Sequence, residues 1–317
     1  YPVAGQSFPD STTYTAYQLA GGTLSLANWR RSNVDTLVQS VSVAVKAARP
    51  NCKFGISPFG IWKPGNPAGV TGLSAYDDIY ADSKKWLQLG WVDFLAPQLY
   101  WKISSSGQPY GALLSWWSQQ NTMGRHVYAA NASYKVADGT TTPWTSQEIR
   151  DQINLTRATS GALGNIHYNF TVLKNDRDTL RTQLIANEYA QPSLIPTSPW
   201  IDNVAPFTPS FTYSYDRATK THSASWTYNG TEAANWIVIA TCVGGVWSHE
   251  VSPATRTTWT RSLKASGTAL QAVAIAAVDR LGNVSPWVGK VIDPSVVTSG
   301  FNVQNAVSNP NGAVFNP

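Results

Sequence analysis

The segment VDFLAPQLYW, residues 92–101, begins like a buried strand and ends in an amide, a phenol and an indole. Gln98 and Tyr100 are hydrogen-bonding groups that can hold a polar group of a ligand, or stabilise charge that develops beside it. We therefore predict that they are catalytic. The alternative is that Gln98 and Tyr100 satisfy only local backbone groups.

Polar and aromatic side chains also follow the other strand-like segments, as in a sugar-binding cleft. We expect them to bind substrate, with the indoles of Trp62 and Trp101 stacking on pyranose rings unless they belong to the core. The predicted binding residues at these strand ends are Ser57, Trp62, Trp101, Asn131, Tyr134, Lys135 and Asn169.

Three more candidates, Trp29, Arg30 and Arg31, lie in a predicted loop ahead of the first long helix. If the ligand is N-acetylmuramic acid, one of these arginines would pair with its lactyl carboxylate. The alternative is that both arginines are solvated surface charges.

Glycoside hydrolysis normally uses two carboxylates. Within residues 1–190 the acidic residues fall on predicted helices and loops, and Asp93 stands at the start of its strand rather than at the end. This arrangement favours substrate assistance, in which the acetamido group of the sugar is the nucleophile. The carboxylates would then come from another segment.

Strand-like and helix-like segments alternate over residues 29–190. We predict helices at 33–48 (capped by Ser32 or Asn33), 75–89 (with Ile79, Trp86 and Leu87 inward, ended by Gly90), 113–120, 145–158 and 175–189. The predicted strands are 53–57, 92–98, 126–131 and 165–170.

This alternation predicts a parallel sheet and favours half of a (β/α)₈ TIM-type barrel at residues 1–190, in which ligands bind at the carboxyl ends of the strands. Four strands do not close a barrel. The first half therefore lies on another chain or segment, or has been removed, or the fold is a smaller open sheet.

The composition changes after residue 190. Residues 191–206 form a predicted linker, and short alternating strands at 207–293 predict a small β-sandwich. "ASW" and "AVAIAAVDRLGNVS" resemble a fibronectin type III domain. It would serve as a spacer or as a glycan-binding accessory. Residues 294–317 form a predicted tail.

The composition excludes several classes of protein. With 14 Trp, 14 Tyr and 13% charged residues, the chain suits a secreted or periplasmic protein that handles neutral polar ligands, and the net charge of +5 suits an anionic polymer. It has no long basic run for nucleic acid, no apolar run for a membrane span and no signal peptide at its start. Four scattered His predict no metal, and we expect no cofactor. Cys52 and Cys242 favour two buried thiols over a disulfide.

The segments "YP…FPD", "NWRRSNVD", "FGISPFGIW", "AYDDIYADSKKWLQLGWVDFLAPQLYW", "YAANASYKV" and "HYNF" resemble the second half of glycosyl-hydrolase-like family 10. The resemblance implies a bacterial glycosidase that acts on peptidoglycan in the cell envelope. It also implies an acidic motif just upstream of residue 1, with Tyr1 and Pro2 as its last letters. The alternative is a non-catalytic glycan-binding or scaffolding protein that keeps the cleft without the acids.

Overall fold

The computed structural model describes residues 8–262 and 269–293. Tyr1, Pro2 and the predicted tail at 294–317 lie outside the described residues. The chain divides into two compact units, residues 1–132 with 159–168, and residues 133–158 with 169–317. Each unit is described by itself.

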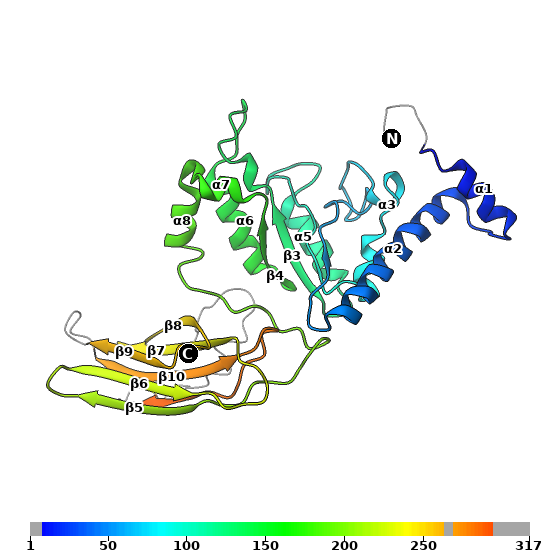
Figure 1. The fold of residues 1–317 in the computed structure, drawn as a ribbon. Helices are drawn as coiled ribbons and strands as arrows, with labels where there is room; N and C mark the ends of the chain where they lie inside the picture. Colours follow the sequence, from blue (N-terminus) through cyan, green and yellow to red (C-terminus); the bar gives the residue numbers. More distant parts are fainter. Residues whose placement is uncertain (1–7, 263–268, 294–317) are drawn as a thin grey trace. The chain divides into compact units, whose positions relative to one another are not determined.

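The first unit is built on a parallel sheet of four strands in sequence order, which confirms the predicted alternation (Figure 1). The strands are β1 (Gly55–Ile56), β2 (Phe94–Leu95), β3 (His126–Asn131) and β4 (Ala162–His167). The strand predicted at 165–170 was therefore placed three residues too late, because Asn169 caps the helix that begins at Phe170. Single bridges from Gln98 to Phe59 and to Ala130 continue the pairing beyond β1 and β2. The helices are α1 (Ser11–Leu19), α2 (Leu26–Ala48), α3 (Ala75–Asp78), α4 (Ser83–Gln88) and α5 (Tyr110–Gln119).

Helix α2 begins seven residues earlier than we predicted. Its cap is Ser25, whose side chain accepts a hydrogen bond from the backbone N–H of Asn28, and not Ser32 or Asn33. Arg, Asn and Ser make up most of the first two turns and leave only Leu26, Ala27 and Trp29 as apolar residues, too few for a clear helical spacing. Trp29, Arg30 and Arg31 consequently lie in the helix, so the predicted loop around them was wrong.

The helix predicted at 75–89 is also wrong as a single element. Tyr80 has a φ of 57°, which ends α3, and Asp82 then caps α4 by accepting from the backbone N–H of Lys85. Trp86 and Leu87 are buried as expected, but Ile79 is exposed. Gly90 takes a positive φ just after α4, as predicted for a residue that ends a helix.

The second unit begins with short helices. They are η1 (Ser133–Lys135), α6 (Ser146–Ala158), α7 (Phe170–Lys174), η2 (Arg177–Thr179) and α8 (Leu180–Ala186). The predicted helix at 145–158 is confirmed, whereas the one at 175–189 is broken. Asp176, Asp178 and Thr179 take positive φ values there, which no α-helix accommodates.

The rest of the second unit is a sandwich of two antiparallel sheets. One sheet has the order β5 (Ser210–Asp216), β6 (Thr221–Thr227), β9 (Thr258–Ser262). The other has the order β11 (Val288–Val291), β10 (Leu270–Val278), β7 (Trp236–Val243), β8 (Val246–Pro253). One core joins them, with Trp226 and Trp259 from the first sheet against Ile237, Ile239 and Ile275 from the second. The predicted β-sandwich is therefore confirmed.

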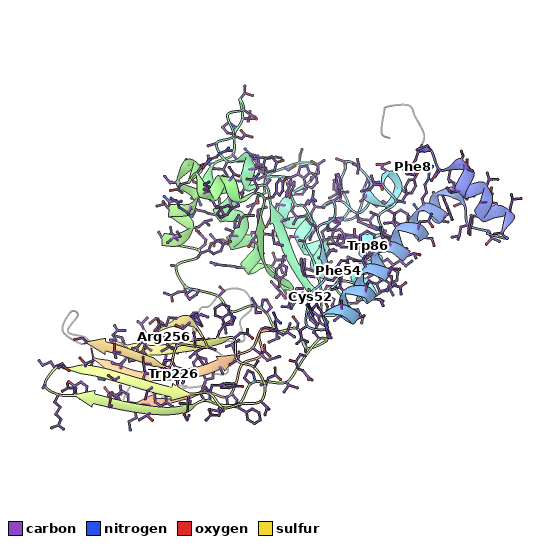
Figure 2. All side chains as sticks on the ribbon, viewed as in Figure 1. Phe8, Cys52, Phe54, Trp86, Trp226 and Arg256 are labelled. Atoms are coloured by element: carbon purple, nitrogen blue, oxygen red, sulfur yellow. The ribbon has the colours of Figure 1, made fainter. Side chains whose placement is uncertain are left out.

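Neither cysteine forms a disulfide. This confirms the prediction of two separate thiols, but Cys52 is exposed and only Cys242 is buried (Figure 2 labels Cys52). Among the described residues, no helix is both long and apolar enough to cross a membrane.

A buried ion pair fixes the first unit at the start of β2. One carboxylate oxygen of Asp93 accepts from the Lys46 ammonium and from the backbone N–H of Phe54, at 2.6 Å each. The side chain of Asp93 is 5% exposed, so losing the ammonium of Lys46 would remove a direct ion-pair partner from a buried charge.

We predict that Lys46→Gln lowers the free energy of unfolding of the first unit by about 2–3 kcal/mol, less than a fully buried pair because Lys46 is partly solvated. The matched control is Lys63→Gln, which removes an exposed ion pair with Asp77 and should cost about 0–1 kcal/mol. Urea unfolding of the two variants measures the difference, and equal losses would contradict the assignment.

Candidate functional site

The carboxyl ends of β1 to β4 lie on one edge of the parallel sheet, and six predicted residues of the first unit lie at or after these ends: Ser57, Trp62, Gln98, Tyr100, Trp101 and Asn131. The hydroxyl of Ser57 donates to the carbonyl of Ala96 at 2.8 Å, and the side-chain N–H of Gln98 donates to the carbonyl of Ser57 at 3.0 Å. Gln98 therefore does satisfy a backbone group. Its Oε1 has no hydrogen bond among the described residues, so it can accept one from an amide N–H of a ligand.

Asn131 is at the centre of a buried polar network at the end of β3. Its side-chain N–H donates to the hydroxyl of Tyr110 at 3.2 Å, and its Oδ1 accepts from Asn165 at 2.8 Å. Asn131 and Tyr110 are both 0% exposed. Asn131 therefore stabilises the edge of the sheet and is not itself exposed to a ligand.

Tyr100 and Tyr168 stack at the same edge, with ring centroids 6.1 Å apart. Tyr168 is 55% exposed, so the pair presents a flat aromatic surface to solvent. His167 precedes it at the end of β4, where burial lowers the pKa of its imidazole to about 4. His167 is therefore neutral near pH 7 and can take part in hydrogen bonds as a neutral ring.

The two indoles predicted at strand ends, Trp62 and Trp101, each pack against neighbouring residues on one side. Trp62 donates its Nε1–H to Asp82 at 2.9 Å and stacks on Trp116 at a centroid distance of 5.9 Å. Trp101 lies over Gly60, where a Cβ would come within 2.9 Å of the indole ring. Both rings are half-buried, which leaves part of each accessible.

The three residues predicted in the first loop lie on α2, and each has a partner outside this helix. Trp29 packs against Tyr14 and Tyr17. Arg31 donates to the carbonyl of Tyr76 at 3.0 Å, and its guanidinium lies over the ring of that residue.

Arg30 is bound most tightly of the three. Its guanidinium donates to both oxygens of Asp10 at 2.7 Å and to the hydroxyl of Tyr80 at 2.6 Å. Arg30 lowers the pKa of Asp10 by this hydrogen bonding. Because the fork of Arg30 is already occupied, the structure gives no reason to expect that it recognises a substrate carboxylate.

All six carboxylates of the first unit serve structure in the same way. Asp35 holds Lys85 and the indole of Trp86, each at 2.7 Å. Asp77 and Asp78 both bind Ser74 at the start of α3. The remaining three are Asp10, Asp82 and Asp93, whose partners are given above. None of the six follows the end of a sheet strand.

The remaining predicted residues belong to the second unit. Lys135 lies over the ring of Trp144 at 5.0 Å, and desolvation lowers the pKa of its ammonium. Tyr134 precedes it in η1. Asn169 caps α7 by accepting from the backbone N–H of Thr171 at 3.1 Å.

One group of side chains in the described residues has the spacing of metal ligands, and it lies in the second unit. The carboxylate oxygens of Asp202, Glu232 and Asp279 lie within 4.8 Å of one another. Asp279 already accepts from the backbone N–H groups of Leu281 and Asn283, so it stabilises the turn after β10.

Comparison with known proteins supports the resemblance to a family. The model of the family described as Glycosyl hydrolase-like 10 matches residues 1–146. This part of the chain is similar to that family. The resemblance read from its motifs is thereby confirmed.

Two glycosyl hydrolases are similar to the family segment and its surroundings. Glycosyl hydrolase YngK of Bacillus subtilis (strain 168) is 37% identical over 219 residues, which cover 67% of this chain and 43% of that protein. Glycosyl hydrolase DigH of Escherichia coli (strain K12) is 37% identical over 139 residues, covering 42% of this chain and 31% of that protein. The chain thus spans less than half the length of either relative.

Among solved structures, an Fn3-like protein from Clostridium thermocellum aligns with 27% of this chain and 92% of its own, at 21% identity and a TM-score of 0.21. A likeness at this TM-score supports no conclusion about fold or function.

Sequence reasoning missed four residues that the glycosyl hydrolase-like sheet brings to its edge. Asn165, His167 and Tyr168 all lie in the strand predicted at 165–170, and alternation along that strand would have placed Asn165 and His167 on one face. Tyr110 carries no such signal, because it comes from the start of α5 and meets Asn131 only in the tertiary structure.

We predict that His167 destabilises the fold in mild acid. Its folded pKa is about 4 against an ordinary 6.5, so the unfolded chain binds the proton first as the pH falls. Stability is therefore complete above pH 6.5 and declines between pH 6.5 and 4, by about 1–2 kcal/mol down to pH 5. Urea midpoints of the wild type and His167→Gln at pH 7, 6 and 5 measure this loss, which the variant should not show. An imidazole NMR titration of His167 centred near 6.5 would refute the prediction.

Proposed function

We propose that residues 1–190 are the C-terminal half of a (β/α)₈ glycosidase barrel that cleaves N-acetylated cell-wall glycan, with peptidoglycan strands as the substrate. Similarity to the family supports the hydrolase class, and the parallel sheet in sequence order supports the barrel. The observation that carries the proposal is the edge beyond β1 to β4. It offers amide, phenol and indole groups, whereas all six carboxylates of the unit are engaged elsewhere.

This inventory suits substrate assistance. The acetamido oxygen of the sugar attacks the anomeric carbon, and the protein has to hold the acetamide and supply an acid. Oε1 of Gln98 would accept from the acetamide N–H, and the hydroxyl of Tyr100 would donate to its carbonyl. The Tyr100–Tyr168 surface, Trp62 and Trp101 would contact sugar rings.

The acids would come from the N-terminal half of the barrel, on a separate chain or an upstream segment. Two features of the first unit support this partner. Strand β1 pairs only with β2 among the described strands, which leaves one edge of the sheet open. Helix α2 exposes apolar side chains, with Leu37 and Val43 each 63% exposed.

The remaining assignments follow from the domain order. Residues 191–206 would be a linker, and residues 207–293 a fibronectin type III-like accessory domain. The division of seven strands into a sheet of three and a sheet of four supports the latter. A glycan substrate of this kind places the protein in the cell envelope, secreted or periplasmic.

The second candidate is a non-catalytic glycan-binding protein. The observation that favours it is the structural use of every carboxylate in the first unit. The two candidates differ in what happens when the upstream half is supplied.

We expect residues 1–317 alone to bind an apolar dye and to release no sugar from glycan strands, because the sheet edge is open and the acids are absent. The same chain produced with its upstream coding region should cleave the strands and lose most of the dye signal. Mass spectrometry of the soluble products measures cleavage. Turnover by residues 1–317 alone would refute the half-barrel, and an inactive but folded longer protein would favour the binding protein.

In the longer protein, Gln98→Ala and Tyr100→Phe should each lower kcat by roughly 10²–10³, the usual loss for one group at a developing charge. The matched control is Gln119→Ala, an exposed amide near the end of α5 that should leave kcat unchanged. The kcat on N-acetylated glycan strands is the measurement. Near-normal turnover in both site variants would assign Gln98 and Tyr100 to structure alone.

A further inference from the structure

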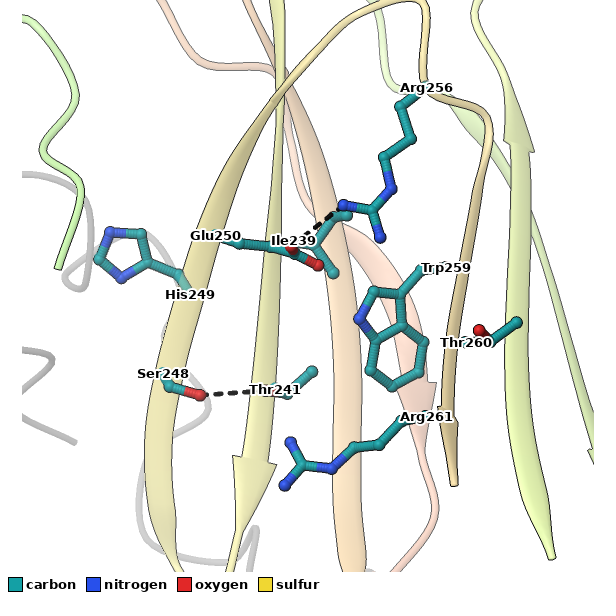
Figure 3. A pocket seen from close by; sticks show the side chains of 9 residues that line it. All are labelled: Ile239, Thr241, Ser248, His249, Glu250, Arg256, Trp259, Thr260 and Arg261. Atoms are coloured by element: carbon teal, nitrogen blue, oxygen red, sulfur yellow. Dashed lines mark hydrogen bonds and ion pairs between the residues drawn. The ribbon is translucent and has the colours of Figure 1, made fainter. Parts of the chain in front are cut away.

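The sandwich has an open side between strands β8 and β9. These strands follow each other in the chain, but each is the edge strand of a different sheet and they do not pair. A pocket of about 400 Å³ lies between them, as Figure 3 shows. Its size is that of pockets that hold a small organic ligand.

The floor of the pocket is an indole with an unused donor. Trp259 is only 7% exposed and lines the pocket, yet its Nε1–H has no acceptor among the described residues. Trp226, on the neighbouring strand, shows the contrast, because its Nε1–H donates to the carbonyl of Arg256 at 2.8 Å. A largely buried N–H aimed into a pocket favours a ligand that accepts its hydrogen bond.

Arg261 supplies the pocket with a cation that, like the indole N–H of Trp259, has no hydrogen-bond acceptor among the described residues. Residues two apart on a strand share a face, so Arg261 follows Trp259 into the space between the sheets, and Figure 3 shows its guanidinium reaching there. It is half-buried and makes no hydrogen bond or ion pair with the described residues. Arg256, at the other end of the pocket, differs because it binds Glu250 at 3.0 Å and Ser252 at 2.9 Å.

The charges select the kind of ligand. The two guanidinium groups of Arg256 and Arg261 and the carboxylate of Glu250 give the pocket a net charge of +1. Burial lowers the pKa of His249, so its imidazole adds no charge near pH 7. A neutral ligand would leave the guanidinium of Arg261 unpaired, which is costly at a half-buried site. A ligand with two negative charges would be repelled by the carboxylate of Glu250. A carboxylate monoanion matches both the charge and the planar fork of an arginine.

The opposite wall offers groups for the rest of such a ligand. The hydroxyls of Thr241 and Ser248 lie 3.1 Å apart and line the pocket. Each can donate and accept, which suits the hydroxyl and acetamido groups of a sugar.

We propose that the pocket between β8 and β9 binds a carboxylate-bearing sugar, with the carboxylate on Arg261 and a second acceptor on Nε1–H of Trp259. The sandwich would then hold an acidic glycan through its own site. The choice of sugar rests on the proposed function, but the site itself involves no bond cleavage.

Residues 1–317 would be titrated with N-acetylmuramic acid, with N-acetylglucosamine as the neutral counterpart, and with lactate as the free carboxylate. Indole N–H signals in NMR report the site, and that of Trp259 is assigned by Trp259→Phe. We expect N-acetylmuramic acid to shift this signal. Arg261→Gln should weaken binding about tenfold or more, since it removes a charge-assisted pair. Arg280→Gln, which removes an exposed charge from the same sandwich, should change it less than about twofold.

The other outcomes overturn the proposal. Equal affinity for the two sugars would mean that the carboxylate is not recognised, and equal affinity for lactate would mean that the sugar is not. Equal losses of affinity in Arg261→Gln and Arg280→Gln would mean that the net charge of the sandwich, and not a contact with Arg261, explains the effect. If no ligand shifts the signal at about 10 mM, a concentration above the dissociation constant of a specific site, the pocket is not a binding site for these ligands. Because the readout is binding, failure here leaves glycan cleavage by the barrel half to be judged by its own assay.

Discussion

Strands β1 and β2 pair over two residues each, so side-chain hydrogen bonds beyond their ends fix their register. At the amino end, Asp93 binds the backbone N–H of Phe54 and draws in Lys46 from α2. At the carboxyl end, the side chain of Ser57 donates to the carbonyl of Ala96 and the side chain of Gln98 donates to the carbonyl of Ser57, which joins the segments that follow β1 and β2. The position of every group at the site edge depends on this register, because a slip of one residue would turn alternate side chains to the other face.

Gln98 therefore has two roles in the proposed site. The N–H of its amide donates to the carbonyl of Ser57, and its Oε1 makes no hydrogen bond among the described residues. This division explains why an amide suits the position better than a carboxylate, which has no N–H to give to the carbonyl of Ser57. It also means that the site is held in place by the fold rather than by a flexible loop, as a preorganised site requires.

The two units treat unpaired polar groups differently. In the first unit, each carboxylate and Arg30 find strong partners, which leaves neutral groups at the sheet edge. In the sandwich, β8 and β9 belong to different sheets and do not pair. The N–H groups of Trp259 and Arg261 lie at the pocket between these strands and have no acceptor among the described residues. A buried donor without an acceptor favours binding of a ligand that accepts its hydrogen bond, whereas a charge that is already paired stabilises the fold.

The sequence by itself determined the alternation of strands and helices, the parallel sheet, the β-sandwich and the family resemblance, because these depend on periodic burial and on contiguous motifs. It placed Gln98 and Asn131 at strand ends, since a strand end is a local feature. It failed at the start of α2 and at the breaks near Tyr80 and Asp178, where caps and positive φ values override apolar spacing.

Only the tertiary structure decided what each side chain binds. Arg30 resembled a free cation until Asp10, twenty residues earlier, was found in its fork. Tyr110 and the pocket at Trp259 were invisible for the same reason. Hydrogen bonds and pockets join residues distant in the chain, and no local pattern records which partners folding brings together.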